Sequence, residues 1–345
     1  ASKGWIGLTW PKEFGGKGYS YLDRLVITEE MLHYGAPVGL HWSADRQIGP
    51  ALIKYGSDEL VREFLPKIIK GEIFFALGLS EKGAGSDLAA LKTSAIERGD
   101  DYILNGQKSG ASGAQHADYL YLVARTDPDA PRHRGISEFI VSTAMPGITI
   151  RPMDDIGRSD DYCEVLLDNV RVTRKYLVGE KNRGFYQIAS QLDYERSGVE
   201  RLMSNYPLFE AIIRYARETL EDGEPIVKNP AIRRKLTELV TEFEVGRLLI
   251  YKVAWLLDKG QLPTYETAVA KVYCTSFEQH VASAAMDILG PYGQLMPDSK
   301  WVPLSGKAIK GYLVSPLYTI QAGTSEILRN IIALRGLGLP RSESS

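Results

Sequence analysis

The sequence predicts a multi-domain α+β protein with an N-terminal helical domain, a central β-barrel or β-sandwich domain and a C-terminal four-helix bundle. Three observations support this prediction. Apolar residues recur with helical spacing in the first part of the chain, alternate with a period of two in the middle, and recur with helical spacing again in the last part. These changes of period predict domains at residues 1–71, 72–178 and 179–345.

Two segments of the first domain have helical spacing. The first, residues 23–33, is followed by Gly35 and Pro37, which favour the end of a helix. The second, residues 57–69, begins at Ser57, a residue type that caps helix N-termini, and acidic residues follow in its first turn. The sequence therefore predicts two helices in this region.

The middle domain contains short runs with high β-propensity, separated by turn signals. Asn105-Gly106 is the strongest hairpin signal, and residues 98–101 form a second expected turn. Several strands at regular spacing are typical of a compact barrel or sandwich. The expected strands are residues 73–79, 102–104, 119–124, 139–141, 148–150 and 165–167.

The last domain contains long amphipathic segments. An apolar face continues from Ile232 to Leu257 over about seven turns, and further helical runs span 264–289 and 324–334. Short loops rich in glycine and proline connect them. This pattern predicts an antiparallel bundle.

Composition excludes several classes of protein. The 345 residues include 41 basic and 43 acidic side chains, so no single-sign field indicates nucleic acid or anionic lipid as the main partner. No apolar run approaches the roughly 20 residues that span a bilayer. Two distant cysteines indicate a reduced, cytoplasmic setting, and five scattered histidines predict no metal site.

A glycine-rich segment follows the first expected strand, at residues 79–87. Its glycines allow close approach of a ligand, and the hydroxyl groups of Ser80 and Ser86 can donate hydrogen bonds. It is not a dinucleotide-binding motif, because the position of the third glycine is occupied by Leu88. An ordinary turn explains the segment equally well.

Two further segments are candidates for chemistry. Residues 193–196 are expected near the start of the first bundle helix, where Glu195 shares a face with apolar neighbours; burial would raise the pKa of this carboxyl group toward that of a base. A solvated Glu195 beside Arg196 is the alternative. Residues 321–329 open the last helix, where Thr324 or Ser325 can cap it and free N–H groups suit an anionic or carbonyl ligand. Capping alone also explains these residues.

Five stretches together resemble the acyl-CoA dehydrogenase family in order and spacing, over essentially the whole chain. They are Trp-Pro-Lys-Glu-Phe-Gly-Gly at 10–16 and the segments at 80–87, 105–108, 164–172 and 323–327. The resemblance implies the acyl-CoA dehydrogenase fold, FAD as cofactor, and α,β-desaturation of an acyl-CoA thioester with electrons passed to electron-transferring flavoprotein. It also implies a homo- or hetero-oligomer (a dimer of dimers) and a leading helical segment that is incomplete in this chain.

The resemblance also implies residue roles. It assigns α-proton abstraction to Glu195, as in isovaleryl-type and long-chain-type members, because Ala322 stands where many other members carry the base. The implied cofactor-binding residues are Leu79, Ser80, Ser112, Gly323 and Thr324, and the implied substrate-binding residues are Ser86 and Arg196.

The chain departs from the family pattern at three places. Gly110 stands where relatives carry a tryptophan packed against the flavin, and residues 218–225 are acidic where relatives carry an Arg-x-x-Phe-Gly motif for a neighbour's FAD. Asp287 replaces a glutamine, and an acid near a pyrophosphate would be repulsive. These departures leave a second hypothesis, a catalytically incomplete partner subunit of a mixed tetramer. A third hypothesis is a relative that uses oxygen.

Overall fold

The computed structural model describes residues 1–341, with the side chains of Leu40 and residues 193–195 outside the description. Packing divides the chain into two compact units. Unit 1 comprises Ala1–Ser20 and Val38–Glu195, and unit 2 comprises Tyr21–Pro37 and Arg196–Ser345. The predicted order of helices, then strands, then helices is confirmed. The domain boundaries derived from the sequence remain predictions.

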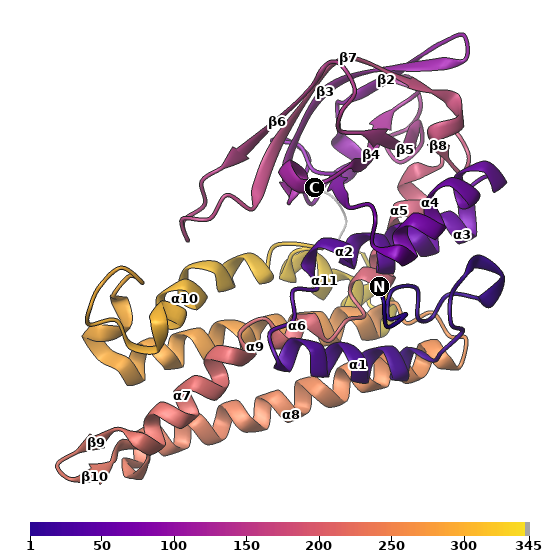
Figure 1. The fold of residues 1–345 in the computed structure, drawn as a ribbon. Coiled ribbons are helices and arrows are strands. Elements are labelled where there is room, and N and C mark those ends of the chain that lie inside the picture. The colour runs from indigo at the N-terminus through magenta and orange to yellow at the C-terminus, as the bar shows by residue number, and fades with distance from the viewer. Residues whose placement is uncertain (342–345) are drawn as a thin grey trace. The chain divides into compact units, whose positions relative to one another are not determined.

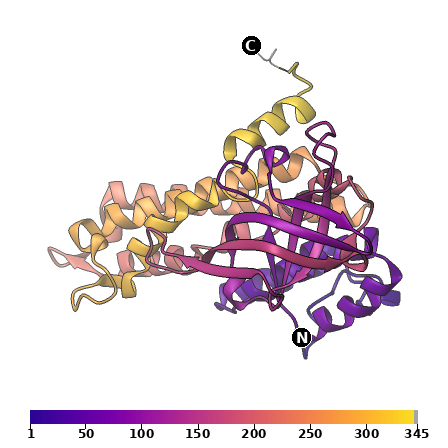
Figure 2. The ribbon, with the colours of Figure 1, turned by 90° about the horizontal axis from the view of Figure 1, so that it is seen from above.

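Unit 1 is built around one mixed sheet. The strands follow the order β6-β7-β3-β2-β4-β5-β8, and β1 pairs with β4 in parallel. Figure 2 shows strands of this sheet lying side by side. The strands are β1 (Phe75–Gly78), β2 (Ser94–Arg98), β3 (Asp101–Ser112), β4 (Tyr119–Arg125), β5 (Ile136–Ser142), β6 (Ile148–Met153), β7 (Tyr162–Thr173) and β8 (Leu177–Val178). The helices of this unit are α2 (Gly39–Ser43), α3 (Gly49–Tyr55), α4 (Asp58–Lys70) and α5 (Gly184–Glu195).

The predicted N-cap of α4 is confirmed. The Ser57 hydroxyl group accepts a hydrogen bond from the Leu60 N–H at 3.3 Å, and the helix ends at Gly71, whose left-handed φ of 67° suits glycine. The apolar face of α4 buries Leu60, Phe64 and Ile68 in a core shared with Phe75 of β1 and Tyr121 of β4. This packing attaches the helix to the sheet.

The prediction of a hairpin at Asn105-Gly106 is wrong. The β2–β3 hairpin turns instead at the second predicted site, where Arg98 pairs with Asp101 around Gly99 and Asp100. Asn105-Gly106 lies inside β3, at a bulge opposite β7. Glycine is required there by close packing, because a Cβ atom on Gly106 would lie 2.5 Å from the hydroxyl oxygen of Thr93. The Asn105 side chain accepts a hydrogen bond from the backbone N–H of Asn169 on β7 at 2.8 Å.

Unit 2 is a helical bundle, as predicted, in which α8 and α9 run side by side (Figure 1). Its core joins residues of α1, α7, α8 and α9, among them Leu25, Phe209, Val253 and Phe277. The helices are α1 (Tyr21–His33), α6 (Glu200–Met203), α7 (Tyr206–Glu218), α8 (Pro230–Asp258), α9 (Tyr265–Leu289), α10 (Lys307–Tyr318) and α11 (Ser325–Ile331), and the strands are β9 (Leu220–Glu221) and β10 (Glu224–Pro225). Within residues 1–341, no helix is long and apolar enough to cross a membrane.

Candidate functional site

The glycine-rich loop after β1 is held by a buried lysine of β3. The ammonium group of Lys108 donates to the Leu79 carbonyl oxygen at 3.2 Å and to Oε1 of Glu81 at 2.9 Å, and its side chain is 1% exposed. The backbone N–H of Ser109 donates to the Ser80 carbonyl oxygen at 2.9 Å. The backbone of Leu79 and Ser80 therefore lies against β3, where it is bonded to Lys108 and Ser109.

Glu81 completes this anchor within unit 1. Its carboxylate also accepts the backbone N–H of Lys92 at 2.7 Å and that of Thr93 at 2.9 Å. Burial acts to raise the pKa of Glu81, but the charge of Lys108 and these hydrogen bonds outweigh it and lower the pKa. Burial lowers the pKa of Lys108 to about 8, against the opposing charge of Glu81. Neither residue has a role predicted from the sequence, although a lysine within a buried strand pattern is a signal for an ion pair.

Several small residues of the glycine-rich loop and of β3 are exposed. Ser80, Ser86 and Ser112 are exposed, so their hydroxyl groups are accessible to a ligand. Gly110 has a left-handed φ of 76° at a second bulge in β3, and a Cβ atom there would meet no atom within 4 Å. Gly110, where the resemblance led us to expect a tryptophan, therefore leaves this position open in unit 1.

In unit 2, two cations hold the turn before α11. The Arg196 guanidinium donates through Nε to the Ala322 carbonyl oxygen at 3.0 Å, and the Lys271 ammonium donates to the Gly323 carbonyl oxygen at 2.9 Å. Ala322 and Gly323 both have left-handed φ values, 56° and 97°. The Thr324 hydroxyl group caps α11 by accepting the Ile327 N–H at 3.2 Å, so the capping prediction is confirmed.

Lys271 lies on α9 and is fully buried. Burial first, and then the nearby charges of Arg201 and Arg196, lower its pKa to about 7, against an opposing effect of Glu326. The structure thus brings three predicted residues, Arg196, Gly323 and Thr324, together around a lysine that sequence analysis missed. A lysine among apolar residues of an otherwise buried helix segment was the available signal.

Glu195 is the last residue of α5, and its side chain lies outside the described residues. The prediction that residues 193–196 lie near the start of a bundle helix is wrong, because α5 ends here and α6 begins only at Glu200. Gly198 lies in the break between them, and glycine is a poor helix former. Val199 therefore lies outside α5 and shares no face of that helix with residue 195.

The acidic departures from the family pattern lie in unit 2. Residues 218–225 contain the hairpin of β9 and β10, whose turn has left-handed φ values at Asp222 (53°) and Gly223 (82°). Asp287 forms an ion pair with Lys235 of α8. The expected repulsion of a nearby anion by Asp287 is therefore reduced by a cation already beside it.

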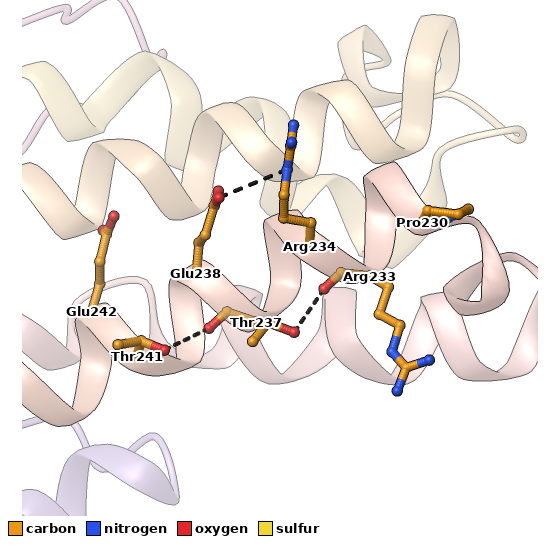
Figure 3. Close-up of a pocket in the computed structure, with 7 residues that line it drawn as sticks. All are labelled: Pro230, Arg233, Arg234, Thr237, Glu238, Thr241 and Glu242. Carbon is orange, nitrogen blue, oxygen red and sulfur yellow. Dashed lines mark hydrogen bonds and ion pairs between the residues drawn. The ribbon is translucent and has the colours of Figure 1, made fainter.

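A surface pocket of about 570 Å³ lies along the first turns of α8 (Figure 3). One helix supplies its whole lining: Pro230, Arg233, Arg234, Thr237, Glu238, Thr241 and Glu242. None of the residues singled out from the sequence belongs to it. Across the described part of the chain, no group of three or more His, Cys, Asp or Glu side chains could hold a metal ion.

Comparisons with known proteins cover the whole of this architecture. The chain matches the acyl-CoA dehydrogenase N-terminal domain over residues 1–72, the middle domain over 76–170 and the C-terminal domain over 182–337. It is 35% identical over 351 residues to acyl-CoA dehydrogenase FadE26 of Mycobacterium tuberculosis, covering 98% of this chain and 86% of that protein.

Two solved structures are similar throughout. The Tcur3481-Tcur3483 steroid ACAD superimposes with a TM-score of 0.91 at 35% identity, covering 99% of this chain and 87% of that one. The ChsE4-ChsE5 complex from Mycobacterium tuberculosis gives a TM-score of 0.91 at 33% identity, covering 99% and 88%.

The three matched domains and the similar structures define a flavin-dependent oxidoreductase that acts on CH–CH groups. The chain belongs to the acyl-CoA dehydrogenase family, so FAD is its cofactor and acyl-CoA oxidation its class of reaction. The residues present fit a flat cofactor, because the unobstructed Gly110 lies on β3 between Ser109 and the exposed Ser112, and Ser109 is hydrogen-bonded to the backbone of the exposed Ser80.

Proposed function

We propose that this protein is an acyl-CoA dehydrogenase that desaturates an acyl-CoA thioester between its α and β carbons, with Glu195 as the base. Glu195 takes the α-proton and the β-hydrogen leaves as hydride, so the Cα–Cβ single bond becomes a double bond. FAD, when bound, supplies the two-electron acceptor for this hydride, and electron-transferring flavoprotein takes the electrons onward.

The position of Glu195 at the end of α5 is the observation that carries this proposal. The C-terminal end of a helix is the negative end of its dipole, which disfavours a carboxylate and favours proton uptake. Ala322, at the position where other family members carry the base, has no group that could accept a proton. Of the two positions at which the resemblance places a base, residues 195 and 322, only residue 195 is a carboxylate.

The loops of the two units supply the proposed binding groups. The resemblance assigns flavin contacts to Ser80, Ser112 and the backbone at Leu79, all in unit 1, and separately to Gly323 and Thr324 in unit 2. Ser86 and Arg196 would bind the CoA substrate. Lys108 and Lys271 keep these backbone segments in place through carbonyl hydrogen bonds, which supports a preorganised site.

The test is an anaerobic visible spectrum before and after addition of a panel of acyl-CoA thioesters. We expect one class of thioester to bleach the oxidised flavin in the wild type, and Glu195→Gln to keep FAD while losing about 100- to 10,000-fold in the reduction rate. Glu30→Gln, the same chemical change at an exposed site of α1, should reduce at the wild-type rate. Undiminished reduction by Glu195→Gln would refute the role of this residue.

The substrate class is a separate part of the proposal. One similar structure is named a steroid ACAD and another is a complex of two unlike chains. The open position at Gly110 leaves room for a bulky group. We therefore place a steroid-derived or other bulky acyl-CoA first in the panel, with straight-chain thioesters of 4 to about 16 carbons as the comparison.

A second candidate function is the supporting subunit of a mixed tetramer. The acidic β9–β10 hairpin, in place of the Arg-x-x-Phe-Gly motif, favours it because acids repel a pyrophosphate. Expression alone and with candidate partner chains decides between the two. A homo-oligomer with stoichiometric FAD and thioester-dependent bleaching supports the first function, whereas a colourless chain that gains flavin only with an unlike partner supports the second.

A further inference from the structure

A cluster of buried polar side chains lies within unit 1, between the sheet and α5. Glu138 of β5 and Tyr121 of β4 are fully buried, and Gln187 and Gln191 of α5 are each 5% exposed. We refer to these four residues as the Glu138 cluster. Neither the proposed chemistry nor the proposed cofactor contacts use any of them.

The carboxyl group of Glu138 accepts three hydrogen bonds. The Tyr121 hydroxyl donates to Oε2 at 2.9 Å and the Gln187 amide donates to the same oxygen at 2.6 Å, while the Gln191 amide donates to Oε1 at 3.0 Å. Gln191 also donates to the Tyr121 hydroxyl oxygen at 3.0 Å. One carboxyl group thus links two strands to two successive turns of α5.

Burying this carboxyl group is costly, so its retention needs a reason. Burial raises the pKa of Glu138 to about 8, and the three hydrogen bonds only partly oppose this. An apolar side chain of similar volume would avoid that cost, and the next residues of β5, Phe139 and Ile140, are buried and apolar. A polar group at this position instead makes the location of α5 specific, because the amides of Gln187 and Gln191 both donate to this one carboxyl group.

The start of α5 is also held closely. A Cβ atom on Gly184 would lie 2.9 Å from the backbone of Ser137, so the helix begins directly against β5. Gln187 makes a second set of contacts, donating to the Val178 carbonyl oxygen at 3.1 Å and accepting the Glu180 N–H at 3.2 Å. Gln191 makes its contact to Glu138 one turn further along α5, about 6 Å of helix rise before residue 195.

We propose that Glu138 is a positioning residue: through Gln187 and Gln191 it fixes α5 against β4 and β5 and thereby sets the location of the helix end that carries the base. This inference rests on the proposed role of Glu195. It assigns a function to a carboxyl group that stability alone does not require, and it predicts that loss of this group impairs proton abstraction without removing the cofactor.

The experiment compares Glu138→Gln with Phe139→Leu in the FAD-loaded protein. Gln keeps the size of the side chain but replaces one carboxyl oxygen by an N–H₂ group, which faces either the two donors on Oε2 or the one donor on Oε1. Phe139→Leu instead weakens the other face of the same strand, where Phe139 packs on Tyr102. We expect Glu138→Gln to retain FAD, to lower kcat about 10- to 100-fold with a smaller change in KM, and to speed hydrogen exchange in residues 184–195. Phe139→Leu should lower Tm while leaving kcat and the exchange of α5 near wild type.

Gln191→Met provides a second variant that keeps the apolar packing of α5 and removes one hydrogen-bonding arm, should Glu138→Gln fold poorly. It should reproduce the loss of kcat and the faster exchange. Wild-type kcat in Glu138→Gln or Gln191→Met, or a loss no greater than that of Phe139→Leu, overturns the proposal. Failure of the Glu195 assignment is separate, because it is read from Glu195→Gln, whereas the exchange of α5 reports on Glu138 whichever residue is the base.

Discussion

Two buried lysines, one in each unit, hold the two backbone segments proposed to bind the flavin. Lys108 donates to the Leu79 carbonyl oxygen at 3.2 Å, and Lys271 donates to the Gly323 carbonyl oxygen at 2.9 Å. Both side chains are essentially inaccessible to solvent. Their neighbours differ: Lys108 has the carboxylate of Glu81 at 2.9 Å, whereas the charges that act most strongly on Lys271 belong to Arg201 and Arg196.

The difference shows that the same interaction with a backbone carbonyl can be built in two electrostatic ways. Glu81 compensates the buried charge of Lys108, which keeps its pKa at about 8. Burial, with the added charges of the adjacent arginines, lowers the pKa of Lys271 to about 7, so near neutral pH this lysine is partly uncharged. An amine still donates a hydrogen bond without its charge. The loop of unit 1 therefore depends on an ion pair, and the turn of unit 2 depends on hydrogen bonds.

The largest effect is expected for removal of the ion pair in unit 1. Lys108→Met should lower the free energy of unfolding by about 3–5 kcal/mol, because it leaves the carboxylate of Glu81 without its buried cation. Urea unfolding of the FAD-free protein measures this. Lys82→Met is the matched control, since Lys82 pairs with Glu164 at 2.9 Å but is 70% exposed and should cost at most about 1 kcal/mol. Equal losses in the two variants would contradict a structural role for the buried pair.

A smaller effect is expected in unit 2. Lys271→Met removes the hydrogen bond to Gly323 but also removes repulsion from Arg196 and Arg201, so we expect a loss of only about 1 kcal/mol. The loosened turn should weaken FAD binding about 5- to 10-fold, measured by titration of the FAD-free protein with FAD. Lys310→Met, at an exposed site of α10, should bind FAD as the wild type does. Unchanged FAD affinity in Lys271→Met would show that the turn does not need this anchor.

The smallest effect is a difference in pH dependence. Between pH 7 and 8 both lysines stay protonated in the unfolded state. In the folded state Lys271, with a pKa of about 7, loses its proton over this interval. Because the unfolded state then binds more protons, the free energy of unfolding rises with pH. Relative to Lys271→Met, the free energy of unfolding of the wild type should increase by no more than about 1 kcal/mol over this interval. Relative to Lys108→Met the gain should be about 0.4 kcal/mol, because the pKa of Lys108 is about 8.

The measurement is the difference in the free energy of unfolding between wild type and variant at pH 7 and at pH 8. Contributions that both proteins share cancel in this difference. A larger gain for Lys108 than for Lys271, or a fall of stability with rising pH in both comparisons, would reverse the order of pKa values on which the contrast rests.

Local signals in the sequence were read correctly where neighbouring residues in the chain decide the structure. Ser57 and Thr324 cap helices because the cap hydroxyl bonds to an N–H three residues later. Asn105-Gly106 was misread because its glycine serves a contact with Thr93, and Thr93 lies 13 residues away in the chain. Local spacing also failed at residues 193–196, where the helix ends although the apolar spacing continues.

The sequence likewise predicted only part of the candidate site. Motif order and spacing were sufficient to indicate the family, and the matched domains confirm it. They did not reveal Lys108, Lys271 or Glu138, because a single buried charge in an apolar stretch has no periodicity of its own. Its role depends on a partner that arrives from a distant segment: Glu81 lies 27 residues from Lys108, and Gln191 lies 53 residues from Glu138.

The sequence by itself determined the helical and β regions of this protein, its helix caps and its family, because each of these follows from residue type at short range or from motifs in fixed order. The tertiary structure alone decided how the loops are held, which charges are compensated and what fixes α5. Those outcomes depend on burial and on distances between remote segments. Burial raises the cost of an unpaired charge, and folding alone brings its partner within hydrogen-bonding distance.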